Sequence, residues 1–122
     1  MRFDMNIIFV GLGGFVGSVL RFLVSKFVQL DKFPAQTLIV NVAAAFAIGC
    51  VIGWERANGA FPPRVKLFLT TGALGGLSTF SAFSLETVQL FENRMYAAGL
   101  LNAALNVVLS LAAVLIGIKL NS

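Results

Sequence analysis

The chain has 122 residues, of which 58% are hydrophobic and only 11% are charged, and its formal net charge is +4. A soluble domain of this length carries about a quarter charged residues, so the composition excludes an ordinary soluble domain and predicts a multi-pass protein of the cell (inner or plasma) membrane. The basic residues are scattered and are not interleaved with aromatic residues in a polar segment, which excludes nucleic acid as a partner.

Four apolar segments are long enough to cross a bilayer, whose hydrocarbon core is about 30 Å thick. They cover roughly residues 7–28, 36–54, 65–91 and 96–118. The sequence therefore predicts an all-α membrane protein with four transmembrane helices in a single integral domain, residues 1–122. Four thin helices leave little room for a hydrated path, so we also expect an oligomer.

The first segment contains Gly13 and Gly17, whose spacing of four lets two helices approach closely. Arg21 follows Ser18 by three positions and lies on the same side of the helix. Two interpretations of Arg21 stand: its long side chain reaches the membrane interface, or it lends positive potential to a vestibule.

The second segment follows a turn at Asp31–Pro34 and carries a polar pair, Thr37 and Asn41, on one helix face. Considered alone, Asn41 is explained by an interhelical hydrogen bond, which contributes about 0.6 kcal/mol in membranes. Gly49 and Gly53 repeat the close-packing spacing of the first segment. Trp54 ends the segment, where an interfacial aromatic residue is expected.

The third segment is unusual because residues 70–83 place three glycines and five hydroxyl side chains inside an apolar run. Glycine is a poor helix former, and Ser and Thr compete for backbone hydrogen bonds, so we predict that the helix breaks near residues 72–79. Irregular backbone at membrane depth survives only when it is buried in protein or faces a water-filled path. This stretch is therefore predicted to be the functional centre.

Phe80 and Phe83 follow the predicted break and lie three apart, on one helix face. The edge of an aromatic ring is electropositive, so two rings turned edge-on offer a weak lining for an anion. Two core phenylalanines are the alternative. Glu86 lies deeper in the same apolar run, and an intramembrane carboxylate either takes part in transport or pairs with a hydroxyl or a cation to fix a helix.

The fourth segment carries a polar stripe, because Asn102, Asn106 and Ser110 recur every four residues. Such a stripe in a membrane helix packs against a polar partner or lines a path. The basic residues are divided almost evenly between the two sides that a four-span topology defines. A chain with so little positive-inside bias is expected to insert in both orientations and to pair as an antiparallel homodimer.

Three motifs together resemble the CrcB/Fluc family of fluoride channels, and the resemblance covers essentially the whole chain. They are Gly-Gly-Phe-Val-Gly-Ser-Val-Leu-Arg-Phe at residues 13–22, Thr-Leu-Ile-Val-Asn at 37–41, and Gly-Ala-Leu-Gly-Gly-Leu-Ser-Thr-Phe-Ser-Ala-Phe at 72–83. The resemblance implies a dual-topology homodimer in the lipid bilayer, with two antiparallel pores that pass fluoride and exclude chloride. It also implies a central sodium ion held by the backbone carbonyls of Gly75 and Ser78.

A dehydrated anion loses tens of kcal/mol of solvation in a low-dielectric medium, so ring edges alone are insufficient ligands. Amide and hydroxyl donors are expected to supply the rest, and the central cation adds to the stability of the anion. The predicted fluoride pathway comprises Asn41, Phe80, Phe83, Ser81, Thr37, Asn106, Ser110 and Arg21, and Glu86, Thr79 and Asn102 are further candidates. Ala44 and Ala45 stand where the family often has Gly-Ser, which removes a hydroxyl from this position.

Two other functions are alternatives for a chain of this size and topology. A small multidrug-resistance-type proton-coupled antiporter has a similar size and topology, but it needs a carboxylate in the first helix, where this chain has none after Asp4. A noncatalytic membrane assembly subunit would leave the polar stripes and the broken helix without a use. An enzyme has little support, because the chain contains no His and no Cys or Ser beside a plausible base.

Overall fold

The computed structural model describes residues 4–28 and 33–122, and within these residues every regular element is helical. The predicted turn at Asp31 and Lys32 lies outside the described residues. The elements, in chain order, are α1 (Asn6–Phe27), α2 (Ala35–Asn58), α3 (Pro63–Lys66), η1 (Leu67–Leu74), α4 (Gly75–Leu77), α5 (Phe80–Glu92) and α6 (Tyr96–Asn121). Three of them, α1, α2 and α6, are long and apolar enough to cross a membrane, which confirms three of the predicted spans.

The third predicted span consists of several consecutive pieces. Residues 63–77 form a rod of α3, the π-helix η1 and the short helix α4, and α5 begins at Phe80. Ser78 and Thr79 between them have extended backbone, with ψ of 155° at Ser78 and φ of −151° at Thr79. The predicted break near residues 72–79 is therefore confirmed, and it lies at Ser78 and Thr79, at the end of the predicted range. Gly72 and Gly75 remain helical.

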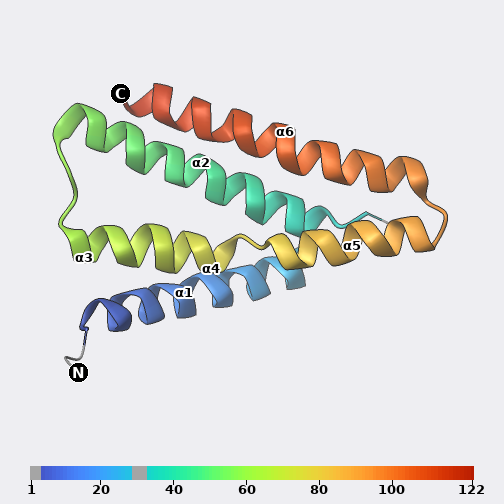
Figure 1. Cartoon of the computed structure of the whole chain (residues 1–122), viewed down its shortest axis with the longest axis horizontal. Helices are drawn as coiled ribbons and strands as arrows, with labels where there is room; N and C mark the ends of the chain where they lie inside the picture. The colour runs from blue at the N-terminus through green and yellow to red at the C-terminus, as the bar shows by residue number, and fades with distance from the viewer. Residues whose placement is uncertain (1–3, 29–32) are drawn as a thin grey trace.

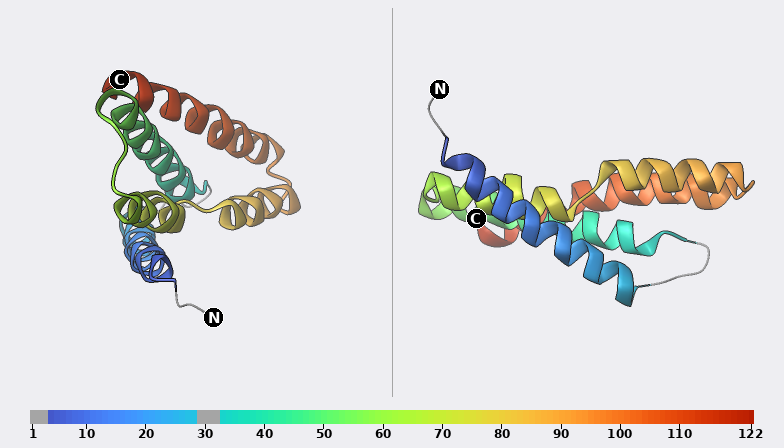
Figure 2. Two further views of the ribbon diagram at one scale, coloured as in Figure 1. Left: turned by 60° about the vertical axis from the view of Figure 1, so that its left-hand side comes forward. Right: turned by 90° about the horizontal axis from the view of Figure 1, so that it is seen from below.

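The helices pack in two main pairs (Figure 1). α2 lies along α6, and α1 lies along η1 and α4. α5 continues beyond the interruption and packs against the first half of α6, as the two rotated views also show (Figure 2). The interruption therefore sits where the two pairs meet, opposite the first half of α2.

Both predicted glycine seams are confirmed. Gly13 and Gly17 are buried, and a Cβ atom at either position would overlap the backbone of η1. Gly49 and Gly53 face the backbone of α6 at Val114 and Ile118 in the same way. The seams explain why glycine is needed inside these helices despite its poor helix propensity: the backbones approach too closely for any side chain.

Gly17→Ala is expected to lower the melting temperature of the purified protein, because its Cβ atom would collide with the carbonyl oxygen of Ala73. Forced overpacking of this kind costs about 1–3 kcal/mol. Gly11→Ala is the matched control, since a Cβ atom at Gly11 meets nothing within 4 Å. Thermal unfolding of both variants in the same detergent checks the prediction, and an equal loss in both would contradict it.

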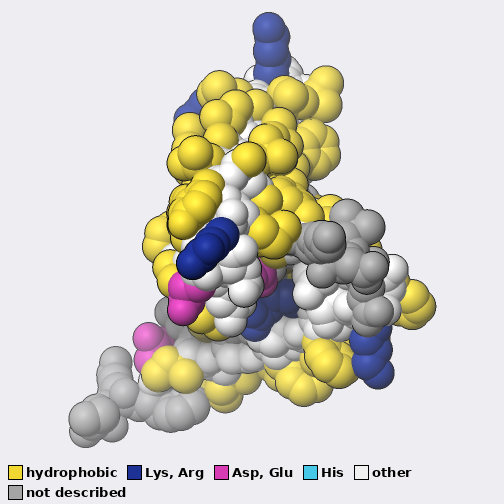
Figure 3. All heavy atoms as spheres, turned by 90° about the vertical axis from the view of Figure 1, so that its right-hand side faces the viewer, with side chains coloured by type: hydrophobic (Ala, Val, Ile, Leu, Met, Phe, Trp, Pro, Cys, Tyr) yellow, Lys and Arg dark blue, Asp and Glu magenta, His cyan; other side chains and the backbone are white. Residues whose placement is uncertain are grey.

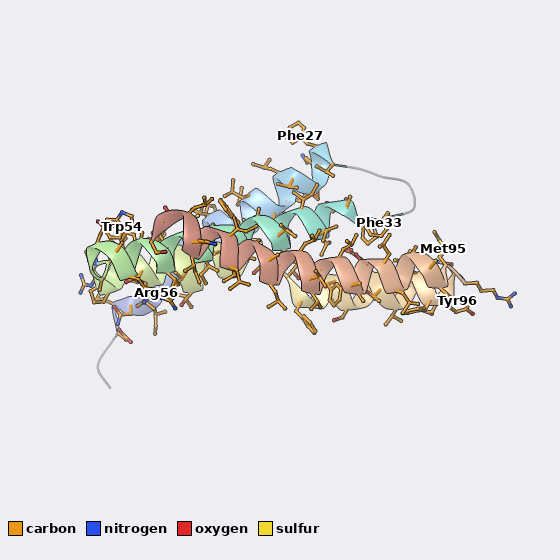
Figure 4. All side chains as sticks on the ribbon, turned by 90° about the horizontal axis from the view of Figure 1, so that it is seen from above. Phe27, Phe33, Trp54, Arg56, Met95 and Tyr96 are labelled. Carbon is orange, nitrogen blue, oxygen red and sulfur yellow. The ribbon has the colours of Figure 1, made fainter. Side chains whose placement is uncertain are left out.

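The single tryptophan and the single tyrosine of the chain lie towards opposite ends of the helix bundle (Figure 4). Figure 4 shows Trp54 and Arg56 near one end and Met95 and Tyr96 near the other. Trp54 stacks on Phe61 with a ring-centroid distance of 4.5 Å. Figure 3 views the end where α5 turns into α6, and hydrophobic side chains cover much of that surface, with charged groups in small separate patches. This distribution fits a protein surrounded by lipid.

Candidate functional site

Asn41 on α2 pairs with the interrupted backbone. The Thr79 N–H donates to the Asn41 Oδ1 atom at 2.8 Å, and Asn41 Nδ2 donates to the Thr79 carbonyl at 3.2 Å. The interhelical hydrogen bond expected for Asn41 is therefore present. An amide that matches both backbone groups of one residue holds that residue in an extended conformation, so Asn41 stabilises the interruption.

At the interruption, two backbone N–H groups donate to side chains instead of to helical carbonyls. In a continuous helix, the N–H groups of Thr79 and Ala82 would donate to the carbonyls of Gly75 and Ser78. Instead, Thr79 N–H donates to Asn41, and Ala82 N–H donates to the Thr79 hydroxyl oxygen at 3.2 Å as the N-cap of α5. The Gly75 and Ser78 carbonyls thereby lose their helical partners, and at membrane depth such groups need another one.

Two of the three residues in the α6 stripe face inwards. Asn102 is fully buried and Asn106 is 6% exposed. Asn41 Nδ2 donates to Asn106 Oδ1 at 2.9 Å, and Asn106 Nδ2 donates to Asn102 Oδ1 at 3.0 Å. Asn102 and Asn106 thus pack against polar partners, and Asn106 also lines a cavity, so a lining role for Asn106 stays a prediction.

A cavity of about 430 Å³ lies beside the interruption. Its lining includes eight of the residues that the sequence singled out: Asn41, Gly75, Ser78, Thr79, Phe80, Phe83, Asn106 and Ser110. Ala44 and Ala45 line it as well, so the replacement of the family's usual Gly-Ser falls directly at this site. These residues come from α2, α4, α5, α6 and the interruption, far apart in the chain.

Phe80 and Phe83 stand side by side at the start of α5. Their ring centroids are 5.5 Å apart, with an interplanar angle of 50°. Phe83 is half-buried, whereas Phe80 is 79% exposed. The prediction that Phe80 and Phe83 lie on one face of the helix is confirmed. The exposed Phe80 ring can contact lipid or a second protein chain.

A second cavity of about 280 Å³ lies on the other side of Thr79, which lines both cavities. Arg21, Thr37 and Glu86 line this second cavity, together with Ser18, Ser25 and Gln36. The Thr37 hydroxyl donates to Glu86 Oε1 at 2.6 Å, whereas Glu86 Oε2 is buried and has no hydrogen-bond partner among the described residues. The predicted pairing of Glu86 with a hydroxyl is therefore present, and a part of Glu86 in transport stays a prediction.

The structure thus divides the predicted pathway into two parts. Arg21 and Thr37 are separated from Asn41 and the phenylalanines by Thr79. Ser81 lines neither cavity; it is exposed, and its hydroxyl lies 3.3 Å from that of Thr79. Sequence reasoning missed Thr87, whose hydroxyl accepts from Asn102 Nδ2 at 2.9 Å. Its position four residues after Phe83 was the one available signal.

Fold and site together define a multi-pass helical membrane protein built around an interrupted helix, with a cavity on each side of the interruption. Residues 8–118 match the family described as CrcB-like protein, Camphor Resistance (CrcB). The chain belongs to this family.

Several curated relatives share most of their length with this chain. A protein of Clostridium novyi (strain NT) is 45% identical over 113 residues, which cover 90% of this chain and 88% of the relative. A Clostridium perfringens protein is 44% identical over 114 residues, which cover 91% of this chain and 89% of the relative. A Ruminiclostridium cellulolyticum protein is 39% identical over 120 residues, covering 96% and 92%. All three carry the name fluoride-specific ion channel FluC.

Proposed function

We propose that this protein is a fluoride-selective channel that lets fluoride leave the cell passively, and that it is not an enzyme. Relatives that share about 40–45% identity over most of the chain carry this name. The observation that carries the proposal is the cavity at the interruption, which is lined by Asn41, Ser110 and the two phenylalanine rings. Neutral donors and ring edges suit a small anion that must be partly dehydrated.

Asn41 has two amide hydrogens, and both are engaged within the chain. One hydrogen bond runs to Asn106 at 2.9 Å and the other to the Thr79 carbonyl at 3.2 Å. A fluoride ion is the stronger acceptor, so it takes the place of the Thr79 carbonyl at the longer of the two bonds. In this proposal Asn41 contacts the ion without leaving its position on α2.

The functional unit is proposed to be an antiparallel homodimer with four spans per chain and two pores. The cavity beside the interruption is open on the surface of one chain, and Phe80 and Gly75 are both exposed there. A Cβ atom at Gly75 would meet only the Thr70 carbonyl, at 3.5 Å, so packing within the chain does not explain this glycine. In the proposed dimer, the close approach of a second copy explains why this position is a glycine.

A sodium ion is proposed at the dimer axis, held by the carbonyls of Gly75 and Ser78 from both chains. The residues fit this role because both carbonyls have lost their helical donors, and carbonyl oxygens are suitable ligands for a monovalent cation. The bound ion would add positive potential close to the anion path. A high-resolution map of the dimer is expected to show a peak bonded to these four oxygens. A water-like peak or an empty axis would contradict the site.

The decisive experiment for the channel function is anion efflux from liposomes containing the purified protein. We expect rapid fluoride efflux and no chloride efflux above that of protein-free liposomes. Equal passage of both anions would refute fluoride selectivity. Efflux that follows an imposed proton gradient would favour the antiporter, and absence of any flux would leave the assembly subunit.

A further inference from the structure

Four side chains form a hydrogen-bonded series, here called the amide relay: Asn41, Asn106, Asn102 and Thr87. Asn41 donates to Asn106 at 2.9 Å, Asn106 donates to Asn102 at 3.0 Å, and Asn102 donates to the Thr87 hydroxyl at 2.9 Å. Thr87 in turn donates to the carbonyl of Phe83 at 2.7 Å. Every donor in the relay points the same way, from α2 through α6 to α5.

The chemistry of the groups fixes this direction. The Thr87 hydrogen is used on a carbonyl, so its oxygen only accepts, and Asn102 must present its NH₂ group to it. The Asn102 carbonyl oxygen then faces Asn106, which gives both amide hydrogens to Asn102, one to the side chain and one to the backbone carbonyl at 2.9 Å. Asn106 therefore has no amide hydrogen left for an ion, and its oxygen is held towards Asn41.

The relay also joins two points on the segment that carries the phenylalanine rings. Asn41 at one end binds both backbone groups of Thr79, and Thr87 at the other end binds the carbonyl of Phe83. Asn102 is fully buried at its centre, so its amide has no access to water if a neighbour is lost. A buried polar series of this kind keeps its geometry only while every member is satisfied.

We infer that Asn102 and Thr87 are positioning residues for the ion path: they act through Asn106 to hold Asn41 while Asn41 exchanges the Thr79 carbonyl for an anion. This inference rests on the proposed channel function. Neither residue lines the cavity at the interruption. Their role is to keep the hydrogen bond from Asn41 to Asn106 fixed. Only the hydrogen bond from Asn41 to the Thr79 carbonyl is then exchanged for the anion.

Thr87→Val and Thr87→Ala test the inference, because both remove the hydroxyl that receives the Asn102 amide. Valine keeps the volume of threonine, and alanine leaves a smaller side chain. The buried Asn102 amide must then turn to find another partner, which withdraws its oxygen from Asn106. We expect fluoride efflux to fall about tenfold, the effect of losing one well-made hydrogen bond in the transition state. Thr87→Ser keeps the hydroxyl and is expected to restore efflux to near the wild-type rate.

Ser84→Ala is the matched control. The Ser84 hydroxyl donates to the Phe80 carbonyl at 2.9 Å in the same helix, one turn from the Thr87 bond, but Ser84 takes no part in the amide relay. Its removal is expected to leave efflux unchanged. All variants are compared as purified dimers of equal melting behaviour, in the same liposomes.

A second measurement separates positioning from a general structural role. In protein labelled with ¹⁵N-asparagine, the side-chain NH₂ resonances of Asn41 and Asn106 are expected to shift in Thr87→Val and Thr87→Ala, and to stay in place in Thr87→Ser and Ser84→Ala. Unmoved Asn41 resonances would overturn the inference, whether efflux falls or not. Wild-type protein without fluoride efflux would refute the channel function, yet the resonances would still decide whether the relay holds Asn41.

Discussion

Fluoride efflux is expected to be abolished in Asn41→Asp while the protein remains folded as the proposed dimer. The carboxylate has no hydrogen to donate to the anion, and its negative charge repels fluoride at the position where α2 hydrogen-bonds to the interruption. The Thr79 N–H keeps its acceptor, because an aspartate oxygen occupies the place of the Asn41 Oδ1 atom. The interruption therefore keeps this hydrogen bond, whereas the two donations from position 41, to the Thr79 carbonyl and to Asn106, are lost.

Asn58→Asp provides the control for Asn41→Asp, since it makes the same replacement on the same helix. Asn58 is exposed near the end of α2, where its amide donates only to the Trp54 carbonyl at 3.2 Å. Size-exclusion chromatography and circular dichroism check the fold of both variants, and liposome efflux measures the function. Efflux at near the wild-type rate in Asn41→Asp would show that Asn41 is not a ligand.

Phe80→Ile and Phe83→Ile are expected to purify as dimers, and at least one of them is expected to lose most of its fluoride efflux. Isoleucine preserves bulk, so replacing either ring should cost under about 1.5 kcal/mol of stability. It removes the electropositive ring edge, however, and both rings line the cavity at the interruption. A large loss of efflux with little loss of stability is the signature of a lining role.

Two control variants match the exposure of the two rings. Phe15 on α1 is 70% exposed, close to Phe80, and Phe91 is half-buried on α5 like Phe83. Phe15→Ile and Phe91→Ile should leave efflux intact in the same assay. If Phe80→Ile and Phe83→Ile are also unimpaired, the rings are only packing, and Asn41 and Ser110 are the polar residues that remain to line the path in this cavity.

Much of the fold is determined by local patterns in the sequence. The predicted spans at residues 7–28 and 96–118 agree closely with α1 (Asn6–Phe27) and α6 (Tyr96–Asn121), because the length of an apolar run is a direct measure of what can cross hydrocarbon. α2 extends past Trp54 to Asn58 because polar residues continue a helix once it leaves the apolar region. The glycine seams were also readable, since a spacing of four defines one helix face.

The site could be predicted only in part from the sequence, because residue spacing defines a helix face but does not say which other helix that face packs against. The sequence by itself brought Asn41, Phe80 and Phe83 together as candidates, and the cavity at the interruption contains all three. Only the tertiary structure decided that Thr37 lies with Glu86 in a separate cavity. It also decided that both amide hydrogens of Asn106 are donated to Asn102. Hydrogen-bond partners come from helices distant in the chain, so a donor's role is settled only when those helices pack. For the same reason the helix is interrupted at Thr79, where Asn41 competes for the backbone, and continues through Gly72, which α1 approaches closely.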